Sequence, residues 1–149
     1  MNKISPLASV SPKAKLGDNI EIGPFAFIDD DVEIGDGCKI HPHAMIYSYV
    51  RMGKNCQVFP GAVVGAIPQD LKYEGEVTYV EIGDNVTIRE CVTINRGTKA
   101  SGKCVTKIGS NTLLMSYVHV AHDCEVGSHC ILVSFVGIAG ETVVDDWAI

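Results

Sequence analysis

Two histidines three residues apart, His119 and His122, have the side chains best suited to proton transfer in this chain. A histidine with an ordinary pKa of about 6.5 can take a proton from a hydroxyl group and return it at physiological pH. An acid, Asp123, follows His122 directly. A histidine at a turn is often only a structural residue, exposed to solvent or hydrogen-bonded to its surroundings. Whether His122 is structural or catalytic therefore depends on the elements that position it.

Those elements are marked by an apolar residue that returns every six positions along almost the whole chain. A period of six matches neither a helix nor a heptad, and Gly, Pro, Asn and Asp break the alternation at fixed places. Each repeat is therefore expected to be a short strand plus a turn. The repeated positions are Ile4, Val10, Leu16, Ile22, Ile28, Ile34, Ile40, Ile46, Met52, Val58, Val64, Ile82, Ile88, Ile94, Ile108, Leu114, Val120, Val126, Leu132, Ile138 and Val144.

The fifth position of each hexad carries a second, smaller apolar residue, such as Ala26, Val50 or Ala62. Both positions would point into a narrow coil whose interior leaves little room near its corners. The pattern predicts an all-β fold, a single-stranded parallel β-helix of about seven coils, with residues 1–149 as one domain.

Four cysteines, Cys38, Cys56, Cys124 and Cys130, occupy the small fifth position and are interpreted as core residues. No Cys-x-x-Cys pair occurs, so we expect no metal site from them. Cys91 and Cys104 lie outside this position.

The hexad register breaks twice. Eighteen residues separate Val64 from Ile82, and fourteen separate Ile94 from Ile108, where six are expected. The excess predicts two inserted loops, at residues 66–79 and around residues 97–103. Loops inserted into a solenoid often gather on one face, and often that face binds.

Counting hexads in threes places both loops in the column that also bears the histidines. The hexads in this column begin at Val64, Ile94, Val120 and Ile138. Stacking then puts Gly140 over His122 and Gly137 over His119. Both loops, both histidines and the two glycines would therefore lie along one edge of the coil, which favours a functional His122. His41, His43 and His129 lie in other hexads and are expected to be structural.

Composition limits the function further. The chain has 149 residues and a formal charge of −6, which argues against nonspecific binding of nucleic acid. No apolar run is long enough to span a bilayer, and Met1 to Ser5 lacks a secretory signal pattern. We therefore expect a cytoplasmic protein without membrane insertion.

Three segments, in order and correctly spaced, resemble a known family. Gln69 to Tyr73, Ile88 to Thr98 and His119 to Cys124 are similar to the UDP-N-acetylglucosamine O-acyltransferases of lipid A biosynthesis, which are hexapeptide-repeat acyltransferases. The resemblance covers the whole chain and implies that the β-helix is left-handed. That handedness comes from the resemblance alone.

The resemblance also implies roles for individual residues. His122 would be the general base that deprotonates the 3-hydroxyl of the glucosamine, which then attacks the thioester of a (R)-3-hydroxyacyl group on acyl carrier protein. Asp123 would orient His122, a contact that requires a bend at the turn or a neighbouring subunit because consecutive strand residues face opposite ways. Gly140 would donate its backbone N–H to the developing oxyanion. The substrate-binding residues would be Gln69, Asp70, Lys72 and His119.

The partners implied are 3-hydroxyacyl carrier protein, UDP-N-acetylglucosamine and two further copies in a homotrimer, with no cofactor and no metal. Glu141 stands where relatives often carry a histidine. Relatives continue through further coils and a C-terminal helical domain, so a truncated chain is expected and its own activity is left open. A basic patch for the acidic carrier protein is a weaker expectation, drawn from Arg89, Arg96, Lys99, Lys103 and Lys107.

Three alternatives stay open. A related sugar N-acyltransferase or acetyltransferase has the same fold and a similar histidine, although the Gln69 to Tyr73 loop argues against it. A zinc enzyme like the γ-class carbonic anhydrases would need a third ligand besides His119 and His122. A non-catalytic scaffold would need none of the clustered loop, histidine and glycine positions.

Overall fold

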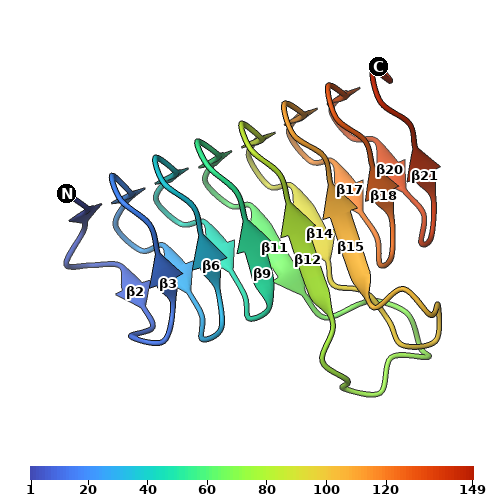
Figure 1. Cartoon of the computed structure of the whole chain (residues 1–149), viewed down its shortest axis with the longest axis horizontal. Helices are drawn as coiled ribbons and strands as arrows, with labels where there is room; N and C mark the ends of the chain where they lie inside the picture. Colours follow the sequence, from blue (N-terminus) through green and yellow to red (C-terminus); the bar gives the residue numbers. More distant parts are fainter.

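The computed structural model describes residues 1–149, which wind into seven stacked coils of very short strands (Figure 1). Each coil contributes one strand to each of three parallel sheets, so the molecule is a three-sided prism. This is the predicted β-helix, with the predicted number of coils. The chain contains no helical segment with the length and apolar content that crossing a membrane requires.

The strands of each sheet follow one another at intervals of three along the chain. The first sheet contains β1 (Lys3–Ile4), β4 (Glu21–Ile22), β7 (Lys39–Ile40), β10 (Gln57–Val58), β13 (Thr87–Ile88), β16 (Leu113–Leu114) and β19 (Ile131–Leu132). The second contains β2 (Ser9–Val10), β5 (Phe27–Ile28), β8 (Met45–Ile46), β11 (Val63–Ala66), β14 (Thr93–Asn95), β17 (His119–Val120) and β20 (Gly137–Ile138). The third contains β3 (Lys15–Leu16), β6 (Glu33–Ile34), β9 (Val50–Met52), β12 (Tyr79–Ile82), β15 (Val105–Ile108), β18 (Glu125–Val126) and β21 (Val143–Val144).

The core is the hollow of the prism, filled by the two apolar positions of each hexad. Thirty buried apolar residues form one continuous cluster, in which Ile46, Val64 and Ile94 are fully buried. The cysteines in the small fifth position are buried there as predicted, with free thiols. Hydrophobic burial of the first position, repeated along the prism axis, therefore holds the coils in register.

The third sheet carries a row of alternating charges on its outer face. In register order the row runs Lys15, Glu33, Arg51, Glu81, Lys107 and Glu125. Each charge therefore has opposite charges on the strands beside it, which stabilises neighbouring strands.

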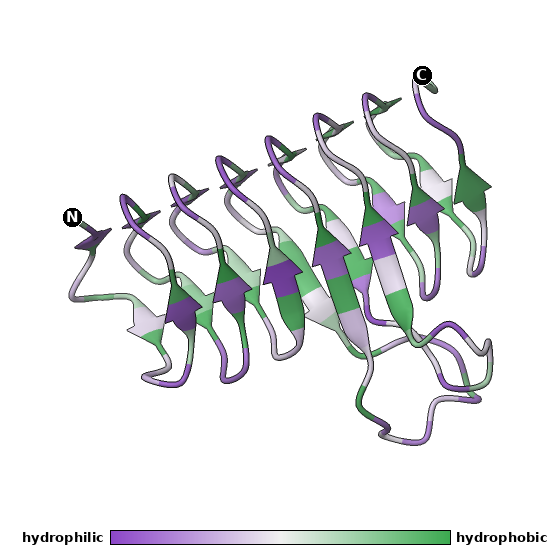
Figure 2. Cartoon of the chain, in the orientation of Figure 1, coloured by the Kyte–Doolittle hydropathy of each residue, from purple (hydrophilic) through white to green (hydrophobic).

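Both register breaks are loops, and both leave the prism at the corner between the second and third sheets (Figure 1). The first loop, residues 67–78, joins β11 to β12, and the second loop, residues 96–104, joins β14 to β15. The two loops lie beside each other and are largely hydrophilic (Figure 2). Their shared corner is the one predicted from counting hexads.

Candidate functional site

The second sheet brings the predicted column together. His119 on β17 pairs with Thr93 on β14 and with Gly137 on β20. One corner further along, Gly140 lies against the imidazole of His122. The stacking of both glycines over both histidines is confirmed.

The side chains of His122 and Asp123 meet although the residues are adjacent in sequence. Asp123 has a φ of 62°, in the left-handed region, which turns its side chain back towards the preceding residue. Nδ1 of His122 lies 2.8 Å from Oδ2 of Asp123. Of the two routes left open by the sequence, this chain uses a bend at the turn.

The carboxylate of Asp123 is fully buried and its oxygens are fixed by donors from the second loop. The Thr98 N–H donates to Oδ1 at 2.8 Å, and the Thr98 hydroxyl donates to Oδ2 at 2.6 Å. Burial would raise the pKa of Asp123, but hydrogen bonds from Thr98 and His122 outweigh burial and hold that pKa below its ordinary value. Asp123 is therefore ionised and can only accept a hydrogen bond, so Nδ1 of His122 is the donor. In a neutral imidazole with the proton on Nδ1, Nε2 is the nitrogen that can accept a proton.

This lowered pKa predicts a pH-dependent contribution to stability. Because the folded pKa lies below the unfolded value of about 3.9, the stabilisation is present above that value and is lost as the pH falls through the folded pKa. The melting temperature of the unaltered chain should exceed that of Asp123→Asn at pH 7, and the gap should narrow below about pH 4. Melting curves across this range check it, with exposed Asp145→Asn as control; a gap that does not change with pH would contradict it.

Gly140 closes over the face of His122. A Cβ atom at this position would lie 2.3 Å from Nε2 and 2.5 Å from Cε1 of the imidazole, which is closer than any real contact. The N–H of the next residue, Glu141, donates to the His122 carbonyl at 2.9 Å and fixes the two coils together. The Gly140 N–H itself donates to no group of the chain.

Asp70 of the first loop approaches the other imidazole nitrogen. Its Oδ2 lies 3.4 Å from Nε2 of His122, and both side chains are largely buried. The Lys72 N–H donates to Oδ1 of Asp70 at 3.0 Å, and the Tyr73 N–H donates to its carbonyl at 3.0 Å, forming a tight turn. The first loop therefore contacts His122 at Nε2 through Asp70, and the second loop holds Asp123, which contacts the same ring at Nδ1.

A buried arginine ties the first loop to the prism. Arg96 is 8% exposed, and its guanidinium donates to the Tyr73 hydroxyl at 2.8 Å and to the Gly65 carbonyl at 3.3 Å. It also lies over the ring of Tyr49, 5.3 Å from the centroid. The Tyr73 hydroxyl in turn donates to the carbonyl of Glu76 at 2.9 Å. This network fixes the segment that carries Asp70.

Removing the Tyr73 hydroxyl should loosen the first loop. Tyr73→Phe deprives Arg96 of an acceptor and Glu76 of a donor, which should cost about 1 to 3 kcal/mol of local stability. Hydrogen exchange of the amides in residues 67–78, followed by mass spectrometry, should become faster. Tyr47→Phe is the control, because the Tyr47 hydroxyl contacts only a methionine sulfur at 3.9 Å. Equal exchange in both variants would contradict the anchoring role.

The other predicted substrate-binding residues have fewer contacts. His119 points outward from β17, with Nδ1 2.6 Å from the Thr93 hydroxyl, and burial lowers its pKa. Gln69 and Lys72 are exposed on the first loop, and Lys72 faces Lys99 across a groove between the two loops. Thus Asp123, Gly140 and Asp70 each lie against His122, whereas His119, Gln69 and Lys72 make no side-chain hydrogen bond with this group.

The expected basic patch is wrong. Arg96 is buried, Arg89 pairs with its neighbour Glu90, and Lys107 stands between two glutamates on the third sheet. Only Lys99 and Lys103 remain exposed on the second loop.

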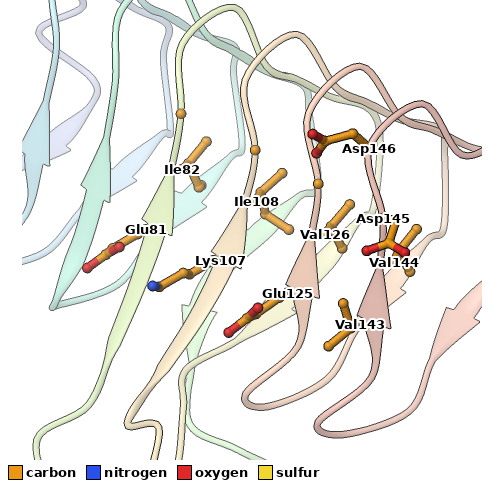
Figure 3. A pocket seen from close by; sticks show the side chains of 13 residues that line it. Glu81, Ile82, Lys107, Ile108, Glu125, Val126, Val143, Val144, Asp145 and Asp146 are labelled. Atoms are coloured by element: carbon orange, nitrogen blue, oxygen red, sulfur yellow. The ribbon is translucent and has the colours of Figure 1, made fainter.

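A hollow on the surface lies on the third sheet, over β12, β15, β18 and β21 (Figure 3). Its floor is the outer face of these strands, where Glu81, Lys107 and Glu125 lie in a row. The lining is mainly acidic, since Asp145 and Asp146 also belong to it, and it does not contain His122, so the hollow is separate from the candidate site. No group of three or more His, Cys, Asp or Glu side chains is arranged so that it could hold a metal ion.

Two contributors to the site were not foreseen from the sequence: Thr98 had no role assigned, and Arg96 was expected on a basic surface. Both lie at the second register break, where the hexad count gives no side-chain direction. The only available signal was their place within the Ile88 to Thr98 segment.

Comparisons with known proteins agree with this architecture. The family described as bacterial transferase hexapeptide (six repeats) matches residues 31–66 and 106–140. The acyl-[acyl-carrier-protein]–UDP-N-acetylglucosamine O-acyltransferase of Xylella fastidiosa is 50% identical over all of this chain and 58% of its own length. Its counterpart in Chlorobium phaeobacteroides is 67% identical over 83% of this chain and 46% of its own length.

Solved structures give the same result. The UDP-N-acetylglucosamine acyltransferase of Bacteroides fragilis superposes with a TM-score of 0.93 and 54% identity, over 95% of this chain and 55% of that one. Another UDP-N-acetylglucosamine acyltransferase gives a TM-score of 0.96 at 46% identity, over 99% and 57%. The fold is thus the left-handed β-helix that the resemblance implied. The chain spans about half the length of the relatives it matches.

Proposed function

The chain belongs to the hexapeptide-repeat acyltransferases, and from this premise we propose that it moves a (R)-3-hydroxyacyl group from an acyl carrier protein thioester to the 3-hydroxyl of UDP-N-acetylglucosamine. This is the first step of lipid A biosynthesis. The observation that supports the proposal is the geometry of His122, whose Nδ1 lies 2.8 Å from the buried carboxylate of Asp123, the arrangement expected of a general base that accepts protons at Nε2.

In the proposed reaction, Nε2 of His122 removes the proton of the sugar 3-hydroxyl as its oxygen attacks the thioester carbonyl carbon. The tetrahedral intermediate carries its negative charge on the former carbonyl oxygen. When it collapses, the carbon–sulfur bond breaks and the imidazolium returns the proton to the leaving sulfur. The products are the 3-O-acylated sugar nucleotide and the free thiol of the carrier protein.

The surrounding residues divide the remaining tasks. Asp123 holds the imidazole in its reactive tautomer and stabilises the imidazolium that forms. The unengaged N–H of Gly140 would donate to the oxyanion, and one such donor is typically worth about 3 kcal/mol of transition-state stabilisation. Asp70 would accept a hydrogen bond from the sugar, displacing its carboxylate from Nε2, while Gln69, Lys72 and His119 would bind the rest of the sugar nucleotide.

The test is mass-spectrometric detection of acyl transfer from 3-hydroxyacyl carrier protein to UDP-N-acetylglucosamine. Two proteins should be assayed: this chain, and a hybrid in which residues 1–149 replace the matching part of the full-length Bacteroides fragilis relative. The hybrid is expected to transfer the acyl group. A folded hybrid that transfers nothing would overturn the proposal.

The choice of acceptor is tested in the same assay. A nucleotide sugar with a 3-amino group should be included beside the 3-hydroxyl sugar. Preference for the hydroxyl supports O-acylation, whereas preference for the amine would assign the chain to the related N-acyltransferases.

We also propose that the enzyme is a homotrimer, since cyclic closure suits a three-sided prism. Exposed apolar side chains beside the second sheet, such as Phe25, Tyr117 and Phe135, offer surface that another copy would cover. Sedimentation equilibrium should give three times the chain mass; a stable monomer would contradict it. The cytoplasm is the proposed location.

A further inference from the structure

In the second loop, the side chain of Thr98 is turned into the fold and is 1% exposed. Its hydroxyl and its N–H both donate to the carboxylate of Asp123, one to each oxygen. Its hydroxyl also accepts from the N–H of Ser101 at 3.3 Å, and its carbonyl accepts from the Ser101 hydroxyl at 2.9 Å. The loop is therefore folded around this residue.

The preceding residue allows Thr98 to reach the carboxylate. A Cβ atom on Gly97 would lie 2.2 Å from the Val105 N and 2.7 Å from Oδ1 of Asp123. Only a glycine fits between the chain and the carboxylate at this point. The close approach of the second loop to Asp123 is thus built into the backbone.

The donors to Asp123 fix the plane in which the carboxylate meets His122. Oδ1 receives the Thr98 N–H, and Oδ2 receives both the Thr98 hydroxyl and Nδ1 of His122. Without the Thr98 hydroxyl, Oδ2 of Asp123 would have only one hydrogen-bond donor, the imidazole of His122. Hydrogen bonds to a charged group are stronger than neutral ones, so this loss is felt at the carboxylate itself.

We propose that Thr98 is a positioning residue for the reaction: the second loop acts on His122 through the Thr98–Asp123 contact, as the first loop acts on it through Asp70. This inference rests on the proposed function for the role of His122. It gives the second loop a task that concerns the general base and requires no contact with substrate.

The experiment compares Thr98→Val, which keeps the shape and removes the hydroxyl, with Thr98→Ser, which keeps the hydroxyl. In the active protein of the transfer assay, Thr98→Val should lower kcat about 10-fold or more, with KM for the sugar nucleotide unchanged. Thr98→Ser should stay within about twofold of the unaltered protein. Thr112→Val is the matched control, because the buried Thr112 hydroxyl donates to the Gly127 carbonyl, away from the site.

A second arm separates positioning from a general loss of structure. In an Asp123→Ala background, Thr98→Val should cause no further loss of kcat, because the group through which Thr98 acts is gone. Additive losses, or equal losses in Thr98→Val and Thr112→Val, would overturn the inference.

A third arm does not depend on catalysis. The proton NMR signal of the His122 Nδ1–H should shift in Thr98→Val and keep its position in Thr98→Ser. An unchanged signal in Thr98→Val would overturn the positioning role. Failure of the proposed function would instead appear as full activity in His122→Ala or as no transfer by the hybrid.

Discussion

Replacement of His122 by alanine should lower kcat/KM for acyl transfer by about 10² to 10⁴-fold, the usual contribution of a general base. In the proposed mechanism Nε2 of His122 is the proton acceptor, because Asp123 accepts from Nδ1, and no other base in the site has a carboxylate partner of this kind. Asp70 is the nearest alternative, at 3.4 Å from Nε2, but it is a carboxylate of much lower ordinary basicity than an imidazole. The measurement is steady-state acyl transfer, with product identified by mass.

His129→Ala is the control for this loss. His129 is an exposed corner histidine that stacks on Trp147, with ring centroids 4.1 Å apart, and it lies on another edge of the prism. Its removal should leave kcat/KM within about twofold. If His122→Ala and His129→Ala were equally active, His122 would be only a hydrogen-bonded corner and the acyltransferase mechanism would need another base.

Gly140→Ala should be nearly as damaging, with a loss of about 10² to 10³-fold in kcat. The added methyl group would stand 2.3 Å from Nε2 of His122, so either the imidazole leaves its place beside Asp123 or the β20–β21 turn moves away. Both movements separate the His122 imidazole from the Gly140 N–H, which would donate to the oxyanion in the proposed mechanism. The loss should appear in kcat at saturating substrate, and a crystal structure of the variant should show a displaced ring.

Gly137→Ala provides a matched comparison three residues earlier, on β20. A Cβ atom on Gly137 would meet nothing within 4 Å, although this residue pairs directly with His119. Gly137→Ala adds the same methyl group in the same coil but brings it into contact with no other atom, so the fold should be unaffected. Equal activity of the two variants would show that the close approach of Gly140 to His122 has no bearing on the reaction.

The repeat made most of the architecture predictable. In regular hexads, one apolar position every six residues fixes which side chains point inward and which strands stack, so residues as far apart as Gly140 and His122 could be placed together. The burial of Cys38 and Cys130 followed from the same count. Such prediction works because each coil contacts only its neighbours in a fixed register.

The register breaks mark the limit of this reasoning. Arg96 was expected on a basic surface and is instead buried beneath the first loop, because the chain leaves the regular hexad path directly after β14. The contact of Thr98 with Asp123 was not foreseen for the same reason. The turn of Asp123 towards His122 depends on one backbone angle at a corner, which the sequence left undecided between two possibilities.

The row of alternating charges on the third sheet has a consequence for how such a prism can change length. Neighbouring members such as Lys15 and Glu33 are one coil apart, so the sign repeats only every second coil. Deleting the Glu33 coil would bring Lys15 beside Arg51, and like charges on adjacent strands are destabilising by a few tenths of a kcal/mol or more. Deleting two successive coils would restore opposite neighbours. On this face, descendants of the chain should therefore gain or lose coils more readily in pairs than singly.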